Sequence, residues 1–441
     1  MNAMTHTHSV HARDEVVVRV TGGRPLTGRV MVQGSKNIAL HLYAAALVAD
    51  EPVTLQGVPA ILDTDVCAQI LIHTGAHATV AGDQFTVHPA EHVTPEVHPD
   101  LGRRVRTTCV LAAAVLARHG RVWFPRPGGD AFCARLFDRH LAAMEAAGAV
   151  VTSDEHGFTA RCGAPGVRPF TVDAGTPYGP SLGATVTALL LAARAPGTSL
   201  ITNPSIEPEV TEAARFLNER GVGIRFDRDG LHVTGSEHIA GGRFRVAGDR
   251  IEAATMIMAA AATGGSVTLG GITTHHMPTG LTAALADAGI LLADQPGGMC
   301  MALTGPLHAV ETATGPHPGL PTDTAPQLAA MLTQAHGTSI VAERIYPRRD
   351  THIGGLTAFG AAVSSKGAEI YVRGVTPLRA ADVAAEDIRA VTALLLAALA
   401  ADGTSTIRGM YHLRRGYGRL LTNLATLGAD ITTLPEAHPC P

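Results

Sequence analysis

Lysine is almost absent from this chain, and one of its two lysines stands where an anion could bind. The 441 residues include 34 basic side chains, of which Lys36 and Lys366 are the lysines. Lys36 lies in Gly34-Ser35-Lys36-Asn37, directly before an apolar run. An ammonium is a compact point charge that fits close to a phosphate or carboxylate, whereas a guanidinium is a planar fork. We therefore expect Lys36 to be needed as a lysine; a capped helix start with a chance lysine is the alternative.

Composition and charge argue against several classes of protein. The formal net charge of −4 gives no reason to expect a nucleic acid or an anionic membrane as partner. The six cysteines show no C-x-x-C pairing, so neither a zinc site nor a disulfide framework is indicated. The apolar stretch 390–401 is too short to span a bilayer, and the N-terminus lacks the apolar segment of a signal peptide. We expect a cytoplasmic protein with a flexible tail over residues 1–15.

An internal repeat sets the organisation of the chain. A module of roughly seventy residues recurs six times, and each copy begins with an Ala-rich helical run that passes into a short β-rich segment. The helical runs lie at 37–50, 103–119, 181–195, 250–263, 322–336 and 387–402. Alternating helices and strands predict an α/β fold with helices packed against sheets. Six copies without an open-ended capping pattern favour a closed body of two lobes, each with three modules.

Basic residues recur at or near the starts of these runs. Lys36, Arg106, Arg250 and Arg389 all lie there. Helix N-termini carry a positive partial charge and unpaired N–H groups, so they bind anions readily. Any one of these side chains could be an ordinary solvated cation. Their recurrence at equivalent positions favours a cationic cleft for a small, multiply charged anion.

Short polar motifs follow one another along the chain and carry a resemblance. They are Gly34–Asn37, Arg106–Thr108, Pro127–Arg135, Ser181–Thr187, Glu207–Glu209, Asp249–Glu252, Pro321–Asp323, Asp387–Arg389 and Tyr411–Tyr417. Together they resemble the enolpyruvyl transferase family, over about residues 16 to 432. The resemblance implies a two-lobed inside-out α/β barrel with three modules per lobe. The first lobe would span residues 36–248, and the second would combine residues 16–35 with 249–441.

The same resemblance implies a donor site for phosphoenolpyruvate. Its phosphate and carboxylate match cationic side chains, which the family places at Lys36, Arg106, Arg135, Arg349, Arg389 and Arg415. The catalytic set comprises Lys36, Arg415 and three acids: Asp323 takes the proton of the acceptor hydroxyl, Glu207 relays charge at the reacting carbon, and Asp130 is the acid of a mobile loop. Residues expected at the acceptor are Asn37, His140, Ser181, Leu182, Gly183 and Asp323. No metal or organic cofactor is implied.

Departures from the family pattern concern the acceptor. Asp130 stands where many members have a reactive cysteine, and neutral Ala60, Leu62 and Gly179 replace lysines that face a diphosphate. These changes favour a smaller uridine nucleotide, such as UMP, as in the branch that opens nucleoside antibiotic pathways. The first alternative is transfer to UDP-N-acetylglucosamine for peptidoglycan synthesis, because the chain resembles that branch most. A second alternative is a phospho-ligand binding protein that has lost catalysis. The oligomeric state stays open.

Overall fold

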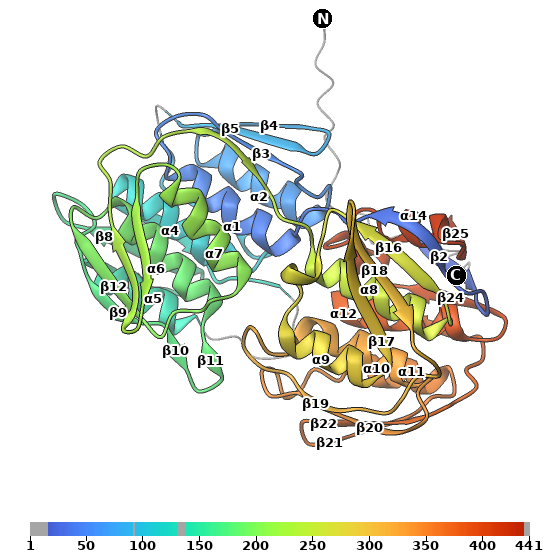
Figure 1. The fold of residues 1–441 in the computed structure, drawn as a ribbon. Coiled ribbons are helices and arrows are strands. Elements are labelled where there is room, and N and C mark those ends of the chain that lie inside the picture. The colour runs from blue at the N-terminus through green and yellow to red at the C-terminus, as the bar shows by residue number, and fades with distance from the viewer. Residues whose placement is uncertain (1–15, 91–92, 130–136, 436–441) are drawn as a thin grey trace, which may run out of the picture.

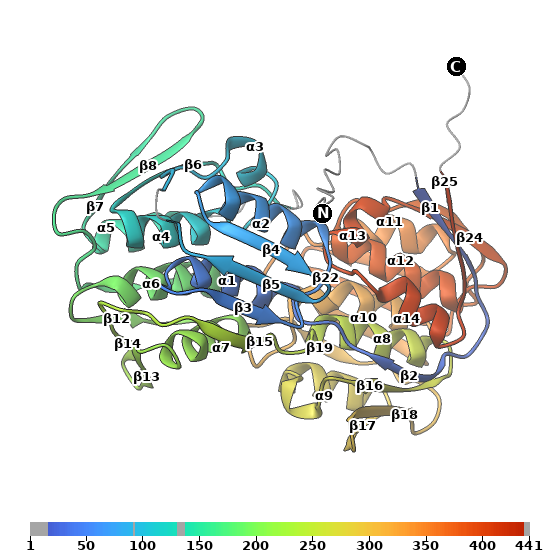
Figure 2. The same ribbon diagram turned by 90° about the horizontal axis from the view of Figure 1, so that it is seen from above.

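A computed structural model describes residues 16–90, 93–129 and 137–435 and places them in two lobes that lie side by side (Figure 1). One hydrophobic core contains residues between Ile38 and Val246, and the other combines residues 18–32 with residues between Ala253 and Leu427. The two N-terminal strands therefore belong to the lobe that the C-terminal half forms, where they lie among its strands (Figure 2). No helix in the described ranges is long and apolar enough to cross a membrane.

The first lobe alternates helices with strands. Its helices are α1 (Lys36–Leu47), α2 (Leu62–His73), α3 (Pro99–Gly102), α4 (Thr108–His119), α5 (Asp138–Ala146), α6 (Leu182–Arg194) and α7 (Pro208–Asn218). Its strands are β3 (Val53–Gln56), β4 (His77–Ala81), β5 (Gln84–His88), β6 (Arg121–Pro125), β7 (Ala149–Ser153), β8 (Gly157–Cys162), β9 (Thr171–Asp173), β10 (Gly175–Thr176), β11 (Gly179–Pro180), β12 (Thr198–Thr202), β13 (Gly223–Asp227), β14 (Gly230–Thr234) and β15 (Gly242–Arg245).

The second lobe repeats this arrangement. Its helices are α8 (Arg250–Ala262), α9 (Thr279–Asp287), α10 (Ala325–Leu332), α11 (Thr351–Ala358), α12 (Ile388–Ala400), α13 (Met410–Arg414) and α14 (Leu420–Thr426), with 3₁₀ turns η1 (Thr274–His276) and η2 (Thr322–Thr324). Its strands are β1 (Val16–Thr21), β2 (Thr27–Met31), β16 (Ser266–Gly270), β17 (Ile290–Gln295), β18 (Gly298–Leu303), β19 (Glu311–Ala313), β20 (Gly337–Ala342), β21 (Ala362–Lys366), β22 (Glu369–Gly374), β23 (Asp382–Ala384), β24 (Thr404–Arg408) and β25 (Asp430–Pro435).

The four-stranded sheets of the described residues are mixed, whereas the three-stranded sheet of β6, β8 and β7 is antiparallel. In one of them β16 pairs parallel with β2 on one side and antiparallel with β18 on the other, and β17 pairs antiparallel with β18. The sheets around β3, β12 and β20 have the same order of parallel and antiparallel neighbours. The predicted α/β class is therefore confirmed.

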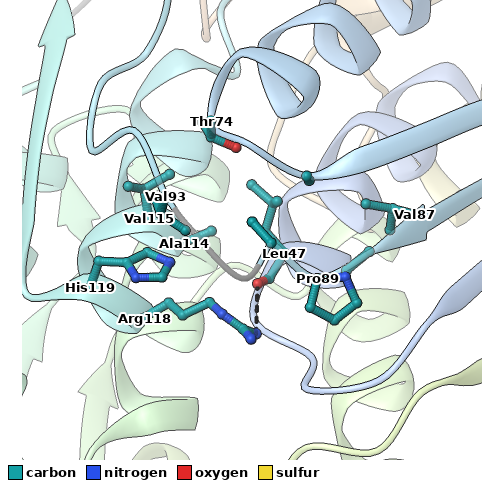
Figure 3. Close-up of a pocket in the computed structure, with 12 residues that line it drawn as sticks. Leu47, Thr74, Val87, Pro89, Val93, Ala114, Val115, Arg118 and His119 are labelled. Atoms are coloured by element: carbon teal, nitrogen blue, oxygen red, sulfur yellow. Dashed lines mark hydrogen bonds between the residues drawn. The ribbon is translucent and has the colours of Figure 1, made fainter.

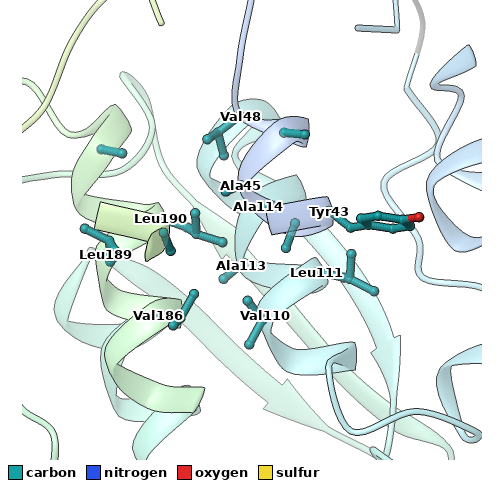
Figure 4. Close-up of a cluster of buried hydrophobic side chains, with 14 of the residues drawn as sticks. Tyr43, Ala45, Val48, Val110, Leu111, Ala113, Ala114, Val186, Leu189 and Leu190 are labelled. Atoms are coloured by element: carbon teal, nitrogen blue, oxygen red, sulfur yellow. The ribbon is translucent and has the colours of Figure 1, made fainter. Parts of the chain in front are cut away.

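Helices α4 and α6 show why the core is rich in alanine. They pack against each other in the middle of the first lobe, with α1 beside α4 (Figure 4). Every residue from Ala184 to Ala193 in α6 is buried, as expected for a helix that is apolar on all sides. Small side chains such as Ala113 and Ala114 in α4 let neighbouring helices approach closely. The scarcity of aromatic residues follows from this packing.

Four of the predicted helices begin with a residue whose side chain caps the helix N-terminus. Ser35 and Ser181 cap α1 and α6 by accepting from the backbone N–H groups of Ile38 and Ala184. Asp249 and Asp387 cap α8 and α12 in the same way. Such residues are strongly preferred at this position because their oxygens satisfy N–H groups that the helix leaves unpaired. Two helices begin later than predicted. Residues 103–107 form turns before α4, and the 3₁₀ turn η2 precedes α10.

The chain crosses between the lobes twice, and the two crossings are bonded to each other. Gly34 and Gly248 form an isolated antiparallel bridge, and the N–H of Ser35 donates to the carbonyl of Ala247 at 2.8 Å. A Cβ on Gly34 would lie 1.7 Å from the carbonyl oxygen of Gly57. Only glycine fits there, because nothing in that backbone contact can move aside cheaply.

We predict that Gly34→Ala destabilises the protein, since the added methyl group must displace the Gly57 carbonyl. Overpacking of this kind costs about 1–3 kcal/mol or more. Thermal unfolding should show a Tm several degrees below that of the native protein. Gly354→Ala is the matched control: Gly354 is exposed in α11 with nothing within 4 Å of the added Cβ. The control should keep or raise the Tm, and an unchanged Tm in Gly34→Ala would contradict the steric argument.

Candidate active site

Asp249 joins the starts of the first helix of each lobe. Its Oδ1 accepts from the N–H groups of Ile251 and Glu252 at 2.8 and 3.2 Å, which caps α8. Its Oδ2 accepts from the backbone N–H of Lys36 at 3.0 Å, at the start of α1. One carboxylate therefore fixes Lys36 relative to the second lobe. It also adds a negative charge at two helix N-termini, where a negative charge is stabilised.

Lys36 and Arg415 share the carboxylate of Asp63. Lys36 Nζ lies 2.8 Å from Asp63 Oδ2, and Arg415 Nε lies 3.1 Å from Asp63 Oδ1. All three residues are buried, although they come from α1, from the first turn of α2 and from the residue after α13. Burial alone would raise the pKa of Asp63, but the charges of Lys36 and Arg415 outweigh burial and lower it. One carboxylate thus brings an ammonium and a guanidinium group together.

A second cluster of the same kind surrounds Asp323 in η2. Arg389 Nη2 donates to Asp323 Oδ2 at 2.6 Å, and Arg349 Nη1 donates to Asp323 Oδ1 at 2.7 Å. Arg389 also donates to the hydroxyl of Tyr417 at 2.7 Å. Burial works to raise the pKa of Asp323, yet the charges of Arg389 and Arg349 lower it far below its usual range. Again one carboxylate is shared by two guanidinium groups.

Glu207 is held at the junction of the lobes. Arg250 donates to Glu207 at 2.8 Å and to both oxygens of the buried Glu209 at 3.2 Å. The backbone N–H of His317 donates to Glu207 at 3.2 Å. Burial and the neighbouring charge of Glu209 raise the pKa of Glu207 to about 7, and Asp323 contributes in the same direction. Because Glu209 holds Arg250 through both oxygens, Glu207 is the carboxyl group of the pair that can titrate near neutral pH.

The residues expected at the acceptor lie mostly at the start of α6. Ser181 caps that helix, Leu182 and Gly183 begin it, and a Cβ on Gly183 would lie 2.8 Å from His140 Cε1. His140 Nδ1 is 2.8 Å from Thr187 Oγ1. Burial, with help from the charge of Arg106, lowers the pKa of His140 to about 3, so this ring is neutral. Asn37 lies in the first turn of α1, beside Lys36.

The structure brings together part of the predicted site. Lys36 joins Arg415, and Asp323 joins Arg349 and Arg389, in the two clusters above. Arg106 lies near His140 and close to Gly129, which precedes the loop with Asp130. Asp130 and Arg135 fall outside the described residues.

Several residues of the clusters were not predicted as site residues: Asp63, Glu209, Asp249 and Tyr417. Arg250, expected in the cationic cleft, instead pairs with Glu207 and Glu209. All except Asp63 lie within motifs that carried the resemblance. Asp63 follows the segment with Ala60 and Leu62, and an acid in the first turn of a helix has an ordinary explanation in the helix dipole.

Gly179 has a backbone reason for being glycine. Its φ of +106° lies in the left-handed region, and a Cβ there would lie 2.6 Å from Pro316 Cγ of the other lobe. In the sequence, the missing lysine at this position favours a smaller acceptor without a diphosphate. The structure adds that neither lysine nor arginine fits here without moving the chain, so the missing charge and the tight contact are linked.

Two cavities among the described residues lie away from these clusters. A cavity of about 20 Å³ is lined by Leu47, Thr74, Val115, Arg118 and others at the C-terminal ends of α1 and α4 (Figure 3). Arg118 reaches the carbonyl of Leu47 there at 3.4 Å. A larger, open hollow of about 840 Å³ adjoins Arg118 and Arg194. Both lie at the opposite ends of the helices from Lys36 and Ser181.

Comparisons with known proteins agree with the fold and with the motifs. Residues 20–424 match the family model of EPSP synthase (3-phosphoshikimate 1-carboxyvinyltransferase). UDP-N-acetylglucosamine 1-carboxyvinyltransferase of Novosphingobium aromaticivorans is 37% identical over 432 residues, with 95% of this chain and 98% of that protein covered. The same enzyme of Trichlorobacter lovleyi is 36% identical over 423 residues, with 95% and 99% covered.

The chain belongs to the EPSP synthase family of enolpyruvyl transferases. Among solved structures, the enolpyruvyl transferase NikO from Streptomyces tendae matches with a TM-score of 0.86 and 27% identity, over 95% of this chain and 98% of that one. EPSP synthase from Acinetobacter baumannii matches with a TM-score of 0.74 at 16% identity, over 95% and 99%, which supports the fold alone. The predictions of the family and of a transferase activity are confirmed.

For this enolpyruvyl transferase we predict that Lys36→Arg keeps the charge but loses most of the rate. Lys36 is buried against Asp63, and its Cδ lies 3.4 Å from where a Cβ on Gly416 would be, so a larger planar fork does not fit. The expected loss in kcat/KM is about 10²–10³-fold, comparable to removing one electrostatic donor. Lys366→Arg, at an exposed position in β21, is the matched control. If Lys36→Arg turned over like the native enzyme, its ammonium would not be specifically required.

The raised pKa of Glu207 gives a pH prediction. Because the pKa is about 7, the carboxylate predominates only above neutral pH. If ionised Glu207 stabilises positive charge at the reacting carbon, kcat/KM rises as pH increases through about 7. Glu207→Gln should lower the rate and abolish this rise, while Glu219→Gln, exposed at the end of α7, should keep it. A rise that persists in Glu207→Gln would assign the titration to another group.

Proposed function

We propose that this enzyme transfers the enolpyruvyl group of phosphoenolpyruvate to a hydroxyl of a uridine nucleotide, with UMP as the favoured acceptor and phosphate as the second product. The observation that carries the donor assignment is the gathering of buried cations in the two clusters. Four cations, Lys36, Arg349, Arg389 and Arg415, lie on the two carboxylates of Asp63 and Asp323. Cations gathered in this way suit a donor that carries a phosphate and a carboxylate.

Donor binding also provides a way to activate Asp323. In the structure its two guanidinium partners hold its pKa very low, which makes it a poor base. An incoming phosphate or carboxylate that takes hydrogen bonds from Arg349 or Arg389 weakens this hold. The pKa of Asp323 then rises toward its ordinary value. Asp323 would thereby become a base when the donor is bound.

The proposed reaction has two steps. The acceptor oxygen adds to C2 of phosphoenolpyruvate while its proton passes to Asp323 and C3 gains a proton, with Asp130 proposed as the acid. The tetrahedral intermediate then loses phosphate and a C3 proton, which restores the double bond. Cations around the departing phosphate stabilise its charge. We assign Lys36, Arg106, Arg135, Arg349, Arg389 and Arg415 to the donor, and Asn37, His140, Ser181, Leu182, Gly183 and Asp323 to the acceptor.

We also propose that each lobe is an inside-out barrel of three modules, with residues 36–248 in one lobe and residues 16–35 and 249–441 in the other. Two observations support this arrangement: the two hydrophobic cores are separate, and α6, α8 and α12 are buried along almost their whole lengths. In such a fold, helix N-termini from both lobes face the junction, where Asp249 lies.

The choice of acceptor rests on neutral residues at Ala60, Leu62 and Gly179. A role in nucleoside antibiotic biosynthesis goes with this smaller acceptor, and the similarity in fold to the enolpyruvyl transferase NikO supports the enolpyruvyl transfer. The second candidate acceptor is UDP-N-acetylglucosamine, because relatives with 36–37% identity carry out that transfer according to their names.

Phosphate release with UMP, UDP-N-acetylglucosamine and shikimate 3-phosphate, each offered with phosphoenolpyruvate, tests the assignment. We expect kcat/KM for UMP to exceed that for UDP-N-acetylglucosamine by about tenfold or more. Asp323→Asn should lower the rate by roughly 10²–10⁴-fold while phosphoenolpyruvate still binds. A preference for UDP-N-acetylglucosamine would establish the second candidate, and a near-normal rate in Asp323→Asn would move the base to another residue.

A further inference from the structure

A short hairpin of the first lobe extends just before the proposed acceptor residues. Strands β10 and β11 pair Gly175 with Pro180 and Thr176 with Gly179. Thr176 Oγ1 donates to the carbonyl of Gly179 at 2.6 Å, and the N–H of Ser181 donates to the carbonyl of Ala174 at 2.8 Å. The hairpin is thus closed on itself and bonded to the cap of α6.

A tight loop of the second lobe extends just before Asp323. The N–H of Gly319 donates to the carbonyl of Pro316 at 2.7 Å, and the N–H of Gly315 donates to the carbonyl of Leu320 at 3.0 Å. The N–H of Gly280 at the start of α9 donates to the carbonyl of Pro318 at 2.9 Å. These bonds hold residues 315–319 in one shape within the second lobe.

The hairpin and the loop meet across the junction of the lobes. Pro316 Cγ lies 2.6 Å from where a Cβ on Gly179 would be, whereas Pro316 Cβ lies at 3.6 Å. The next residue, His317, donates its N–H to Glu207 of the first lobe at 3.2 Å. The loop therefore contacts the first lobe twice, once at the hairpin and once at a proposed catalytic acid.

We propose that Gly179 and Pro316 form a clasp that closes one end of the acceptor site and limits the acceptor to a nucleoside monophosphate. The proposal rests on the proposed function, since it concerns the size of that acceptor. The hairpin leads directly into Ser181–Gly183 and the loop leads into Asp323, so the clasp joins the two segments proposed to hold the acceptor. A steric barrier of this kind selects against the longer competitor without adding any contact to the shorter one.

The clasp makes a different prediction from ordinary packing. Tyr178 and Pro316 are exposed, so the contact buries little surface and contributes little to stability. If the contact is only packing, its removal changes the Tm slightly and leaves the ratio of acceptors unchanged. If it is a barrier, its removal changes that ratio and leaves the donor unaffected.

Pro316→Ala tests the barrier because it removes Cγ, the Pro316 atom that lies nearest to the Cβ position of Gly179. We expect the ratio of kcat/KM for UDP-N-acetylglucosamine to that for UMP to rise about tenfold, mainly through a lower KM of the longer acceptor. The KM for phosphoenolpyruvate should stay within about twofold. Pro306→Ala, at an exposed loop position of the same lobe, is the matched control and should leave the ratio unchanged.

Gly179→Ala alters the same contact from the side of the hairpin, by adding an atom instead of removing one. Its methyl group meets Pro316 and strains a residue with φ of +106°, so it pushes the hairpin and the loop apart. The kcat/KM of this variant for UMP should fall. A measurement of its Tm serves as the control that the variant folds. An acceptor ratio that is unchanged in both variants overturns the clasp, whichever acceptor the native enzyme prefers. A native preference for UDP-N-acetylglucosamine instead overturns the proposed function, so the two failures are distinguishable.

Discussion

The carboxylate of Asp249 ties the first helix of one lobe to the first helix of the other, and the position of Lys36 depends on it. It caps α8 through two N–H groups and accepts a third from the start of α1. The crossings beside it are bonded through Gly34, Gly248 and Ser35. A buried carboxylate that lost one of these donors would pay a large desolvation cost, so the bonds reinforce one another. These bonds therefore fix the starts of α1 and α8 relative to each other.

Four buried cations of the proposed site lie in two pairs, and each pair shares one carboxylate. Lys36 and Arg415 hold Asp63, and Arg349 and Arg389 hold Asp323. Buried cations without partners would be costly, so the carboxylates stabilise the folded protein. Because each carboxylate has two cations, an arriving anion can gain hydrogen bonds without leaving an acid entirely unpaired. The same arrangement links donor binding to the basicity of Asp323.

The sequence predicted the helices better than the contacts between them. Ala-rich runs indicated the buried helices because burial on all sides requires small or aliphatic residues at every position. Lys36 could be predicted as a site residue because lysine is so rare in this chain. Asp63 could not be predicted as one, because its partner Arg415 lies 352 positions away and an acid at a helix start is common for local reasons. At Gly179 the sequence indicates only that a lysine is missing. It does not indicate the contact with Pro316, because Pro316 belongs to the other lobe and leaves no trace in the local sequence.

Donor and acceptor recognition therefore depend on different kinds of structure. Four of the proposed donor residues, Lys36, Arg349, Arg389 and Arg415, are buried cations held by the carboxylates of Asp63 and Asp323. In the proposed clasp, the acceptor side depends on where two surface segments, the β10–β11 hairpin and residues 315–319, meet. Loop segments tolerate substitution more readily than buried helix starts do. On this proposal, a change of acceptor would require a change only where these segments meet, while the proposed chemistry at Lys36 and Asp323 is kept.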